Sequence, residues 1–152
     1  MKILGIDPGS NLGICILDIN SLTIDTYCFK IIDLIEVYDN LNFILDKYKP
    51  ILIGMETAFV NHKFPHSGIY LSRIIGAIEL SLKLNDRYSI LYKFPPKYIK
   101  AFYGSGDFTK NDLAKVFKLD CSTHEIDATA IAYILYSYYK SNPYLLYRFL
   151  QN

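Results

Sequence analysis

The N-terminal stretch Met1-Lys-Ile-Leu-Gly-Ile-Asp-Pro-Gly-Ser-Asn-Leu-Gly13 carries the strongest structural signal in the chain, because it joins a buried strand, a carboxylate and a tight turn. The apolar residues before Asp7 predict a buried strand, which Pro8-Gly9 ends at once. A second strand-like run follows at 12–18. Placing a carboxylate at the end of a buried strand costs free energy unless a cation lies close to it. Asp7 is therefore a candidate metal ligand or general base.

The 152-residue chain has the composition of a globular protein, with 51% hydrophobic residues. This length suffices to bury a sizeable core, and we predict a single domain that spans residues 1–152. No apolar run approaches the roughly 18 residues that a membrane-spanning helix needs, and Asp7 and Pro8 interrupt any signal peptide. The three cysteines match neither a disulfide framework nor a zinc site. We therefore expect a cytoplasmic protein that does not interact with membranes.

The formal net charge of +1 conceals an uneven distribution of charged residues. Residues 1–60 carry four lysines and eight acidic residues, whereas residues 61–123 carry ten basic and five acidic residues. A nearly neutral protein with a basic middle segment is expected where one face of the molecule meets a polyanion and the opposite face does not.

The order of the predicted elements indicates the fold class. Strands are predicted at 2–7, 12–18, 23–29, 51–56 and 89–93, and helices at 31–48, 67–84, 95–103, 109–118 and 123–140. Three strands in antiparallel succession are thus followed by alternating helices and strands. This order predicts an α/β fold in which one mixed five-stranded sheet is flanked by helices.

Four polar side chains are candidate ligands of a metal ion. Glu56 ends a buried strand, as Asp7 does, and ligand sites form at such strand ends in α/β sheets. His124 and Asp127 lie at i and i+3 of the last predicted helix and therefore share one face. The alternative is helix capping, with Thr123 as the N-cap and acids in the first turn. Convergence of the four side chains would instead form an oxygen-rich site for two Mg²⁺ or Mn²⁺ ions, which is suited to phosphodiester cleavage.

Four blocks of sequence occur together in a characteristic order. They are Gly5-Ile-Asp-Pro-Gly-Ser10 with Gly13, Met55-Glu-Thr-Ala-Phe59, Lys100 with Gly104-Ser-Gly106 and Lys110, and His124-Glu-Ile-Asp-Ala-Thr-Ala-Ile-Ala132. In order and spacing these blocks resemble the RuvC family of Holliday-junction resolvases, and the resemblance covers roughly residues 2–135. It implies a ribonuclease-H-like fold, a homodimer, and paired Mg²⁺-dependent nicks across a four-way DNA junction.

The resemblance also implies roles for individual residues. Asp7, Glu56, His124 and Asp127 match the metal-binding acidic site of the family, which is expected to hold two Mg²⁺ ions and to accept Mn²⁺. Lys110 matches a basic residue that approaches the DNA strand near the scissile phosphate, so we assign it to catalysis as well as to DNA binding.

Further positions are candidate DNA contacts. Lys100 matches a second basic residue near the scissile phosphate, and Phe59 matches an aromatic residue that contacts DNA at the crossover. Lys63 lies in a segment that we expect to be a loop close to DNA. Arg73, on the predicted helix 67–84, is either a solvated charge or a phosphate contact, and the sequence does not separate these possibilities.

His124 is a departure from the most frequent family pattern, in which many members have Asp. An imidazole removes one negative charge and adds a nitrogen ligand, which shifts the site toward Mn²⁺ relative to an Asp, and we expect activity that is sensitive to His protonation. Branch-migration proteins are possible partners, although nothing in the sequence indicates them.

Paired nicks on two strands require two active sites, and hence a dimer. The apolar residues Ile69, Ile74, Ile75 and Ile78 of the second predicted helix are candidates either for the dimer interface or for the core.

The residues of the chain are also consistent with other functions. One alternative is a less selective nuclease that cuts flaps or Y-forks, and another is a resolvase-like nuclease that acts on RNA. An actin-like phosphotransferase also opens with an Asp-x-Gly hairpin, but it needs a second similar domain. An inactive DNA-binding module is disfavoured because all four metal positions carry competent ligands.

Overall fold

The computed structural model describes residues 1–57, 65–85, 90–104 and 109–142. Its centre is a five-stranded sheet with the strand order β3-β2-β1-β4-β5. The strands are β1 (Lys2–Asp7), β2 (Asn11–Asp18), β3 (Thr23–Lys30), β4 (Leu52–Glu56) and β5 (Ile90–Phe94). The pairs β1–β2 and β2–β3 are antiparallel, whereas β1–β4 and β4–β5 are parallel. The predicted mixed sheet is therefore confirmed.

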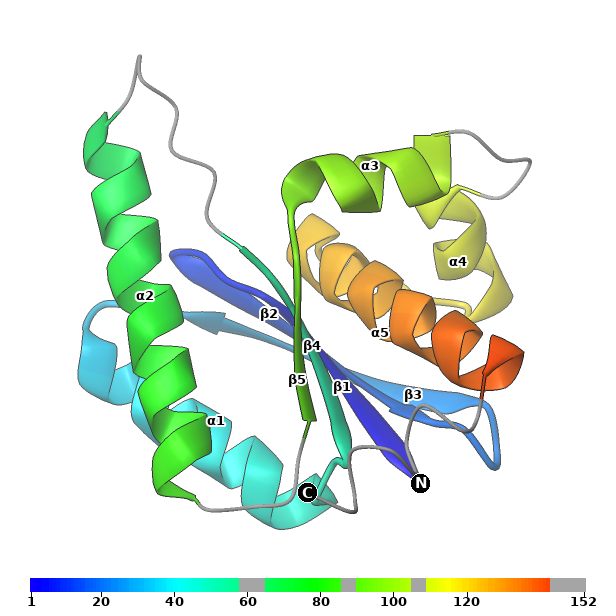
Figure 1. Ribbon diagram of the computed structural model, residues 1–152, viewed down its shortest axis with the longest axis horizontal. Coiled ribbons are helices and arrows are strands. Elements are labelled where there is room, and N and C mark those ends of the chain that lie inside the picture. Colours follow the sequence, from blue (N-terminus) through cyan, green and yellow to red (C-terminus); the bar gives the residue numbers. More distant parts are fainter. Residues whose placement is uncertain (58–64, 86–89, 105–108, 143–152) are drawn as a thin grey trace.

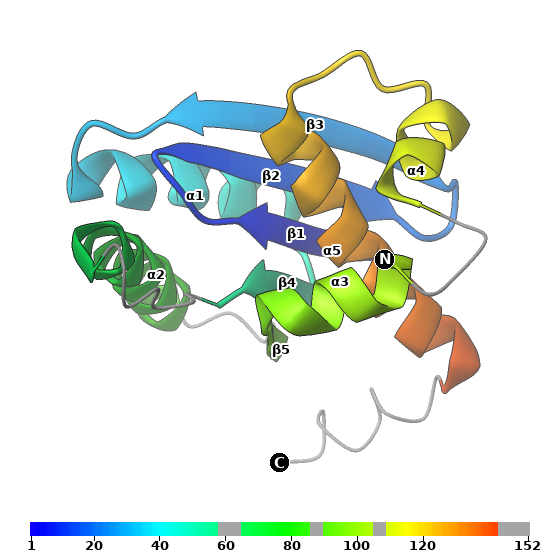
Figure 2. The same cartoon turned by 90° about the horizontal axis from the view of Figure 1, so that it is seen from above.

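Helices cover both faces of this sheet, as Figures 1 and 2 show. The described helices are α1 (Leu34–Tyr48), α2 (Pro65–Leu84), α3 (Pro96–Gly104), α4 (Lys110–Val116) and α5 (Thr123–Ser141). Helices α1 and α2 pack on one face around one apolar cluster, and α3, α4 and α5 pack on the other around a second cluster. None of these described helices is long and apolar enough to cross a membrane.

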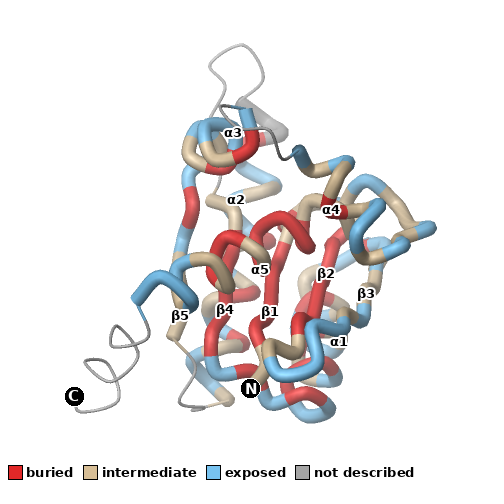
Figure 3. Tube along the Cα trace, turned by 90° about the vertical axis from the view of Figure 1, so that its right-hand side faces the viewer, coloured by how far each residue is buried: buried red, intermediate tan, exposed pale blue. Residues whose placement is uncertain are grey.

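The two core clusters follow from the alternation of side chains along the strands. In β1, Leu4 and Ile6 are buried against α1 and α2, whereas Ile3 is buried on the α5 side. Buried residues accordingly concentrate in β1, β2, β4 and the part of α5 that faces them (Figure 3). The apolar runs of sequence are therefore the strands that are covered on both faces.

Helix α5 approaches the sheet more closely than most side chains would permit. A Cβ atom at Gly5 would collide with the carbonyl oxygen of Ala128, and one at Gly13 would collide with the carbonyl oxygen of His124. Glycine at these two positions lets the first turns of α5 lie directly on β1 and β2. The start of α5 is thereby placed beside the carboxyl end of β1.

Capping explains where helices α5 and α1 begin. Helix α5 has Ser122 as its N-cap, not Thr123, because the Glu125 carboxylate accepts the backbone N–H of Ser122 at 3.0 Å and completes a capping box. Helix α1 begins at Leu34 instead of residue 31, because the Asp33 side chain accepts the backbone N–H groups of Ile35 and Glu36.

Candidate active site

Two of the candidate ligands lie at the carboxyl ends of neighbouring parallel strands. Asp7 ends β1 and Glu56 ends β4, and the parallel register of these strands brings the two ends to one edge of the sheet. Both residues line one cavity of about 260 Å³, together with Pro8, Thr57, Leu71 and Pro96. The Asp7 side chain is only 14% exposed, so its carboxylate has lost most of its contact with water.

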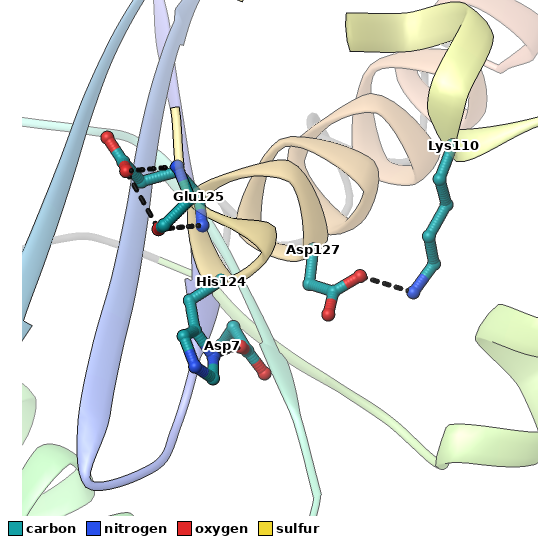
Figure 4. Close-up of polar contacts among 6 residues, drawn as sticks. Asp7, Lys110, His124, Glu125 and Asp127 are labelled. Atoms are coloured by element: carbon teal, nitrogen blue, oxygen red, sulfur yellow. Dashed lines mark hydrogen bonds and ion pairs between the residues drawn. The ribbon is translucent and has the colours of Figure 1, made fainter. Parts of the chain in front are cut away.

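His124 contributes from the other side of this edge. It lies in the first turn of α5, and its Nδ1 atom is 3.0 Å from Oδ2 of Asp7 (Figure 4). The capping role that was the alternative for this turn belongs to Ser122 and Glu125, which leaves the imidazole free to face the sheet. Sequence positions 7 and 124 are therefore in direct contact in the folded chain.

Asp127 lies one turn further along α5, where it meets a lysine from α4. The Nζ atom of Lys110 is 2.5 Å from Oδ1 of Asp127, and each side chain is 35% exposed (Figure 4). Lys110 is the first residue of α4, whose start is stabilised by a capping box between Thr109 and Asp112. The lysine expected to approach DNA thus contacts one of the predicted metal ligands.

Burial and mutual repulsion shape the electrostatics of these carboxylates. Burial raises the pKa of Asp7 above its ordinary value, the hydrogen bond from His124 opposes this rise, and the charge of Asp127 adds to it. Burial likewise raises the pKa of Glu56, and the charge of Asp7 adds to that rise, while Lys110 lowers the pKa of both carboxyls. Close carboxylates that are costly to ionise are stabilised by a cation.

The donor set suits a hard divalent cation. Three carboxylates and one imidazole lie around the ends of β1 and β4, and Mg²⁺ and Mn²⁺ prefer oxygen ligands. Within the described ranges, no three His, Cys, Asp or Glu side chains are arranged so as to enclose an ion as they stand. In this arrangement His124 is paired with Asp7, and Lys110 is paired with Asp127.

The other predicted DNA contacts lie on α2, on α3 or outside the described residues. Lys100 is exposed on α3, and Arg73 is exposed on α2, where it lines an apolar groove with residues of α1. Phe59 and Lys63 lie outside the residues that the structure describes.

Thr57 is a residue of this site to which the sequence patterns assigned no role. Thr57 lines the cavity, and its backbone N–H donates to the carbonyl oxygen of Phe94 at 2.9 Å, which ties the end of β4 to the end of β5. Its place directly after Glu56 in the block Met55–Phe59 was the signal that could have identified it. The Ser122–Glu125 capping box was likewise readable from the three-residue spacing.

Comparisons with known proteins identify the relatives of the chain. No family model matches it. It is 35% identical over 132 residues to the crossover junction endodeoxyribonuclease RuvC of Helicobacter pylori strain ATCC 700392 / 26695, which covers 78% of this chain and 80% of that protein. It is 32% identical over 130 residues to the RuvC of Sulfurovum sp. strain NBC37-1, which covers 78% of this chain and 79% of that one.

Solved structures share the fold. The structure of T. thermophilus RuvC in complex with Holliday junction substrate superposes with a TM-score of 0.74 at 17% identity, and covers 93% of this chain and 95% of that one. The yeast mitochondrial Holliday junction resolvase gives a TM-score of 0.53 at 16% identity, and covers 86% of this chain and 76% of that one. The predicted ribonuclease-H-like fold is thus confirmed, and the identity to the curated relatives places the chain in the RuvC family of crossover junction endodeoxyribonucleases.

Proposed function

We propose that this protein is a structure-selective endodeoxyribonuclease that resolves four-way DNA junctions by paired, metal-dependent cuts. The contact between Asp7 and His124, beside Glu56 in the same cavity, is the observation that carries this proposal. It supports a metal site where β1, β4 and α5 meet. The names of the curated relatives and the junction bound to the T. thermophilus protein support the choice of substrate.

The residues proposed to hold the metal are Asp7, Glu56, His124 and Asp127, and two Mg²⁺ or Mn²⁺ ions are the proposed cofactors. Bound divalent cations supply activation of water and stabilisation of the charge on the leaving oxygen. Burial of Asp7 keeps its carboxylate away from bulk water, and the 3.0 Å contact with His124 fixes its direction. The protein therefore orients the Asp7 carboxylate before an ion binds.

Basic residues supply the affinity for the DNA backbone in this proposal. Lys100 is exposed on α3 and is available to a phosphate, whereas Lys110 is within reach of the carboxylates and of a phosphate placed beside them. A phosphate contact contributes to binding of every DNA sequence and makes that binding dependent on salt. Phe59 and Lys63 remain proposals for contacts with the DNA.

A homodimer is the proposed assembly, because two symmetric nicks require two active sites. The surface proposed for it is the groove between α1 and α2, a cavity of about 390 Å³. Its lining consists of Leu34, Ile35, Tyr38, Arg73, Gly76, Ala77 and Leu80. Ile35 is 68% exposed and Leu80 is 56% exposed, which is unusual for such large apolar side chains on one groove.

The structure divides the apolar residues of α2 that were candidates for this interface. Ile74 and Ile78 are fully buried in the core beneath α2, so they belong to the packing of the monomer and not to an interface. Ile69 is 59% exposed and Ile75 is partly buried. The proposed interface accordingly uses the outer side of α2, next to α1.

A gel assay tests the function. A four-way junction, a Y-fork, a linear duplex and a branched RNA are each incubated with Mg²⁺, Mn²⁺ or EDTA, and the products are treated with ligase. We expect cleavage of the four-way junction alone, in either metal, into nicked duplexes that ligase can seal. Asp7→Asn serves as the inactive control. Equal cleavage of Y-forks would favour a debranching nuclease, and cleavage in EDTA would contradict the metal-dependent mechanism.

A further inference from the structure

The ion pair between Lys110 and Asp127 joins the capped starts of two helices, α4 and α5. The capping box of Thr109 and Asp112 sets the first turn of α4, and the fully buried Leu113 anchors that helix in the core. On the other side, α5 begins at a second capping box. The 2.5 Å contact therefore joins two fixed backbones through one flexible lysine side chain.

The Lys110 ammonium acts on more than its direct partner. Its positive charge opposes the rise in the pKa of both Asp7 and Glu56, so its field reaches all three carboxylates of the candidate site. These carboxylates repel one another, since Asp127 and Asp7 each disfavour ionisation of their neighbours. Lys110 thus supplies, from within the chain, part of the positive charge that the carboxylates require.

We propose that Lys110 is an internal counterion, which occupies an oxygen of Asp127 until a divalent ion binds and then leaves it. The inference rests on the proposed metal-dependent function. An ammonium 2.5 Å from Oδ1 of Asp127 would repel a divalent ion brought to the same carboxylate. A lysine has a long flexible stem and can move its ammonium to another anion. Binding of metal would therefore release Lys110, and a DNA phosphate beside the site could then receive it.

Two consequences follow from this exchange. In the absence of DNA, Lys110 competes with metal, so removing its charge should strengthen metal binding even though it should weaken catalysis. In the presence of DNA, a phosphate that draws Lys110 away from Asp127 would assist metal binding, and by reciprocity metal would assist DNA binding. A lysine that served only as a phosphate contact would leave the metal affinity of the free protein unchanged.

The test is a calorimetric titration of the full chain with Mn²⁺, without DNA. We expect Lys110→Met to bind Mn²⁺ about 5–10-fold more tightly than the wild type, which is at the lower end of ordinary coupling between sites. Lys110→Arg keeps the charge and should stay close to the wild type. Lys115→Met is the matched control, because Lys115 lies on the same helix, is 80% exposed and pairs with Asp112 at 3.8 Å.

Thermal unfolding of the same proteins supplies a readout that does not depend on activity. Lys110→Met should unfold at a lower temperature than the wild type in EDTA, because its carboxylates have lost their counterion. Its stabilisation by Mn²⁺ should be larger, since tighter binding to the native state gives a larger shift. Equal Mn²⁺ shifts for the two proteins would overturn the proposal.

A third measurement avoids substitution altogether. In the wild-type protein, reaction of lysines with acetic anhydride is followed by mass spectrometry of peptides. Mn²⁺ should increase the labelling of Lys110 and leave Lys115 unchanged, because only Lys110 is released from an ion pair. If the wild type binds Mn²⁺ but neither the affinity of Lys110→Met nor the labelling of Lys110 changes, the counterion proposal is wrong and the proposed nuclease stands. If the wild type binds no Mn²⁺, both fail.

Discussion

At the scale of single residues, the buried carboxylate of Asp7 lowers the stability of the fold when it is ionised. Its carboxylate ends the central strand, is 14% exposed, and has a pKa that burial raises. The native state therefore holds this carboxyl more readily in its neutral form than the unfolded chain does. Proteins retain such costly groups where function requires them, and their replacement often stabilises the fold.

The sign of this effect leads to a test with Asp7→Asn. Ionisation of Asp7 lowers stability as the pH rises from the ordinary value of 3.8 through the higher native value, and the loss is complete above that value. In EDTA at pH 7, Asp7→Asn should therefore unfold at a higher temperature than the wild type. Each 1 kcal/mol corresponds to roughly 2–4 °C for a chain of this size. The difference should vanish below the ordinary value of 3.8.

Asp18→Asn is the control, because Asp18 is a partly exposed acid whose pKa is lowered by the backbone N–H of Asn20. Ionisation of Asp18 favours the fold above its ordinary pKa, so this substitution should leave stability at pH 7 unchanged or slightly reduced. A melting temperature of Asp7→Asn at or below that of the wild type would contradict the burial argument. Differential scanning calorimetry across pH 3–8 provides the measurement.

His124 lends itself to a prediction that separates a ligand from a structural residue. Because Ser122 and not His124 caps α5, His124→Ala should change stability by less than about 1 kcal/mol, yet junction cleavage should be severely impaired. His124→Asp should remain active and show a lower ratio of Mn²⁺ to Mg²⁺ activity, because an oxygen ligand suits Mg²⁺. Wild-type cleavage rates for His124→Ala in both metals would rule out a ligand role.

At the scale of elements, the capped start of α5 carries two candidate ligands, His124 in the first turn and Asp127 one turn further on. Ser122 and Glu125 satisfy each other's backbone N–H groups, and Gly13 lets this turn lie against β2. The turn is therefore positioned by hydrogen bonds and close packing before any ligand binds. A misplaced first turn should therefore lower the rate of cleavage more than the affinity for DNA.

Ser122→Ala tests the positioning role of this cap. We expect a loss of about 1 kcal/mol of stability, because one helix donor loses its acceptor. The rate of cleavage at saturating junction should fall, whereas junction affinity should change little. Ser122→Thr supplies the same acceptor and should restore both quantities toward the wild type. A fall in stability with an unchanged cleavage rate would show that the cap is structural only.

At the scale of the whole molecule, the two sheet faces have different roles in the proposal. Helix α5 covers one face of the sheet, and α1 and α2 cover the other (Figure 1). The first turn of α5 lies at the edge with the candidate active site, and the exposed apolar groove is lined by residues of α1 and α2. The candidate metal ligands and the proposed dimer surface thus lie on different elements. A change in the groove can therefore alter assembly without touching a candidate ligand.

Leu80→Glu tests the dimer surface, because it places a charge where Leu80 is 56% exposed in the groove. Light scattering at micromolar concentration should give twice 17.5 kDa for the wild type and 17.5 kDa for the variant. The variant should also lose coordinated nicking of the two strands. Leu84→Glu is the matched control, since Leu84 lies one turn further on and is 62% exposed outside the groove. A monomeric wild type that still resolves junctions would contradict the dimer.

Local sequence patterns were sufficient to predict the fold class and the order of its elements. Periodicity and turn residues predicted the order of strands and helices, because the spacing of apolar residues within each element defines its buried face. The sequence also placed Asp7 and Glu56 at the ends of buried strands, and the parallel pairing of β1 with β4 in the structure brings these ends to one edge. The i, i+3 spacing of His124 and Asp127 placed both on one face of the last helix, and the family resemblance added their role as metal ligands.

Tertiary structure alone decided the contacts between elements distant in sequence. Spacing along α2 could not separate the buried Ile74 from the exposed Ile69, since that depends on which sides of the helix have neighbours. The pairing of Lys110 with Asp127 depends on where α4 is docked, because a long lysine side chain adopts the rotamer that reaches an anion. Local residues determine the shape and polarity of each element, whereas the electrostatics of the site arise only when packing brings distant charges within a few ångströms.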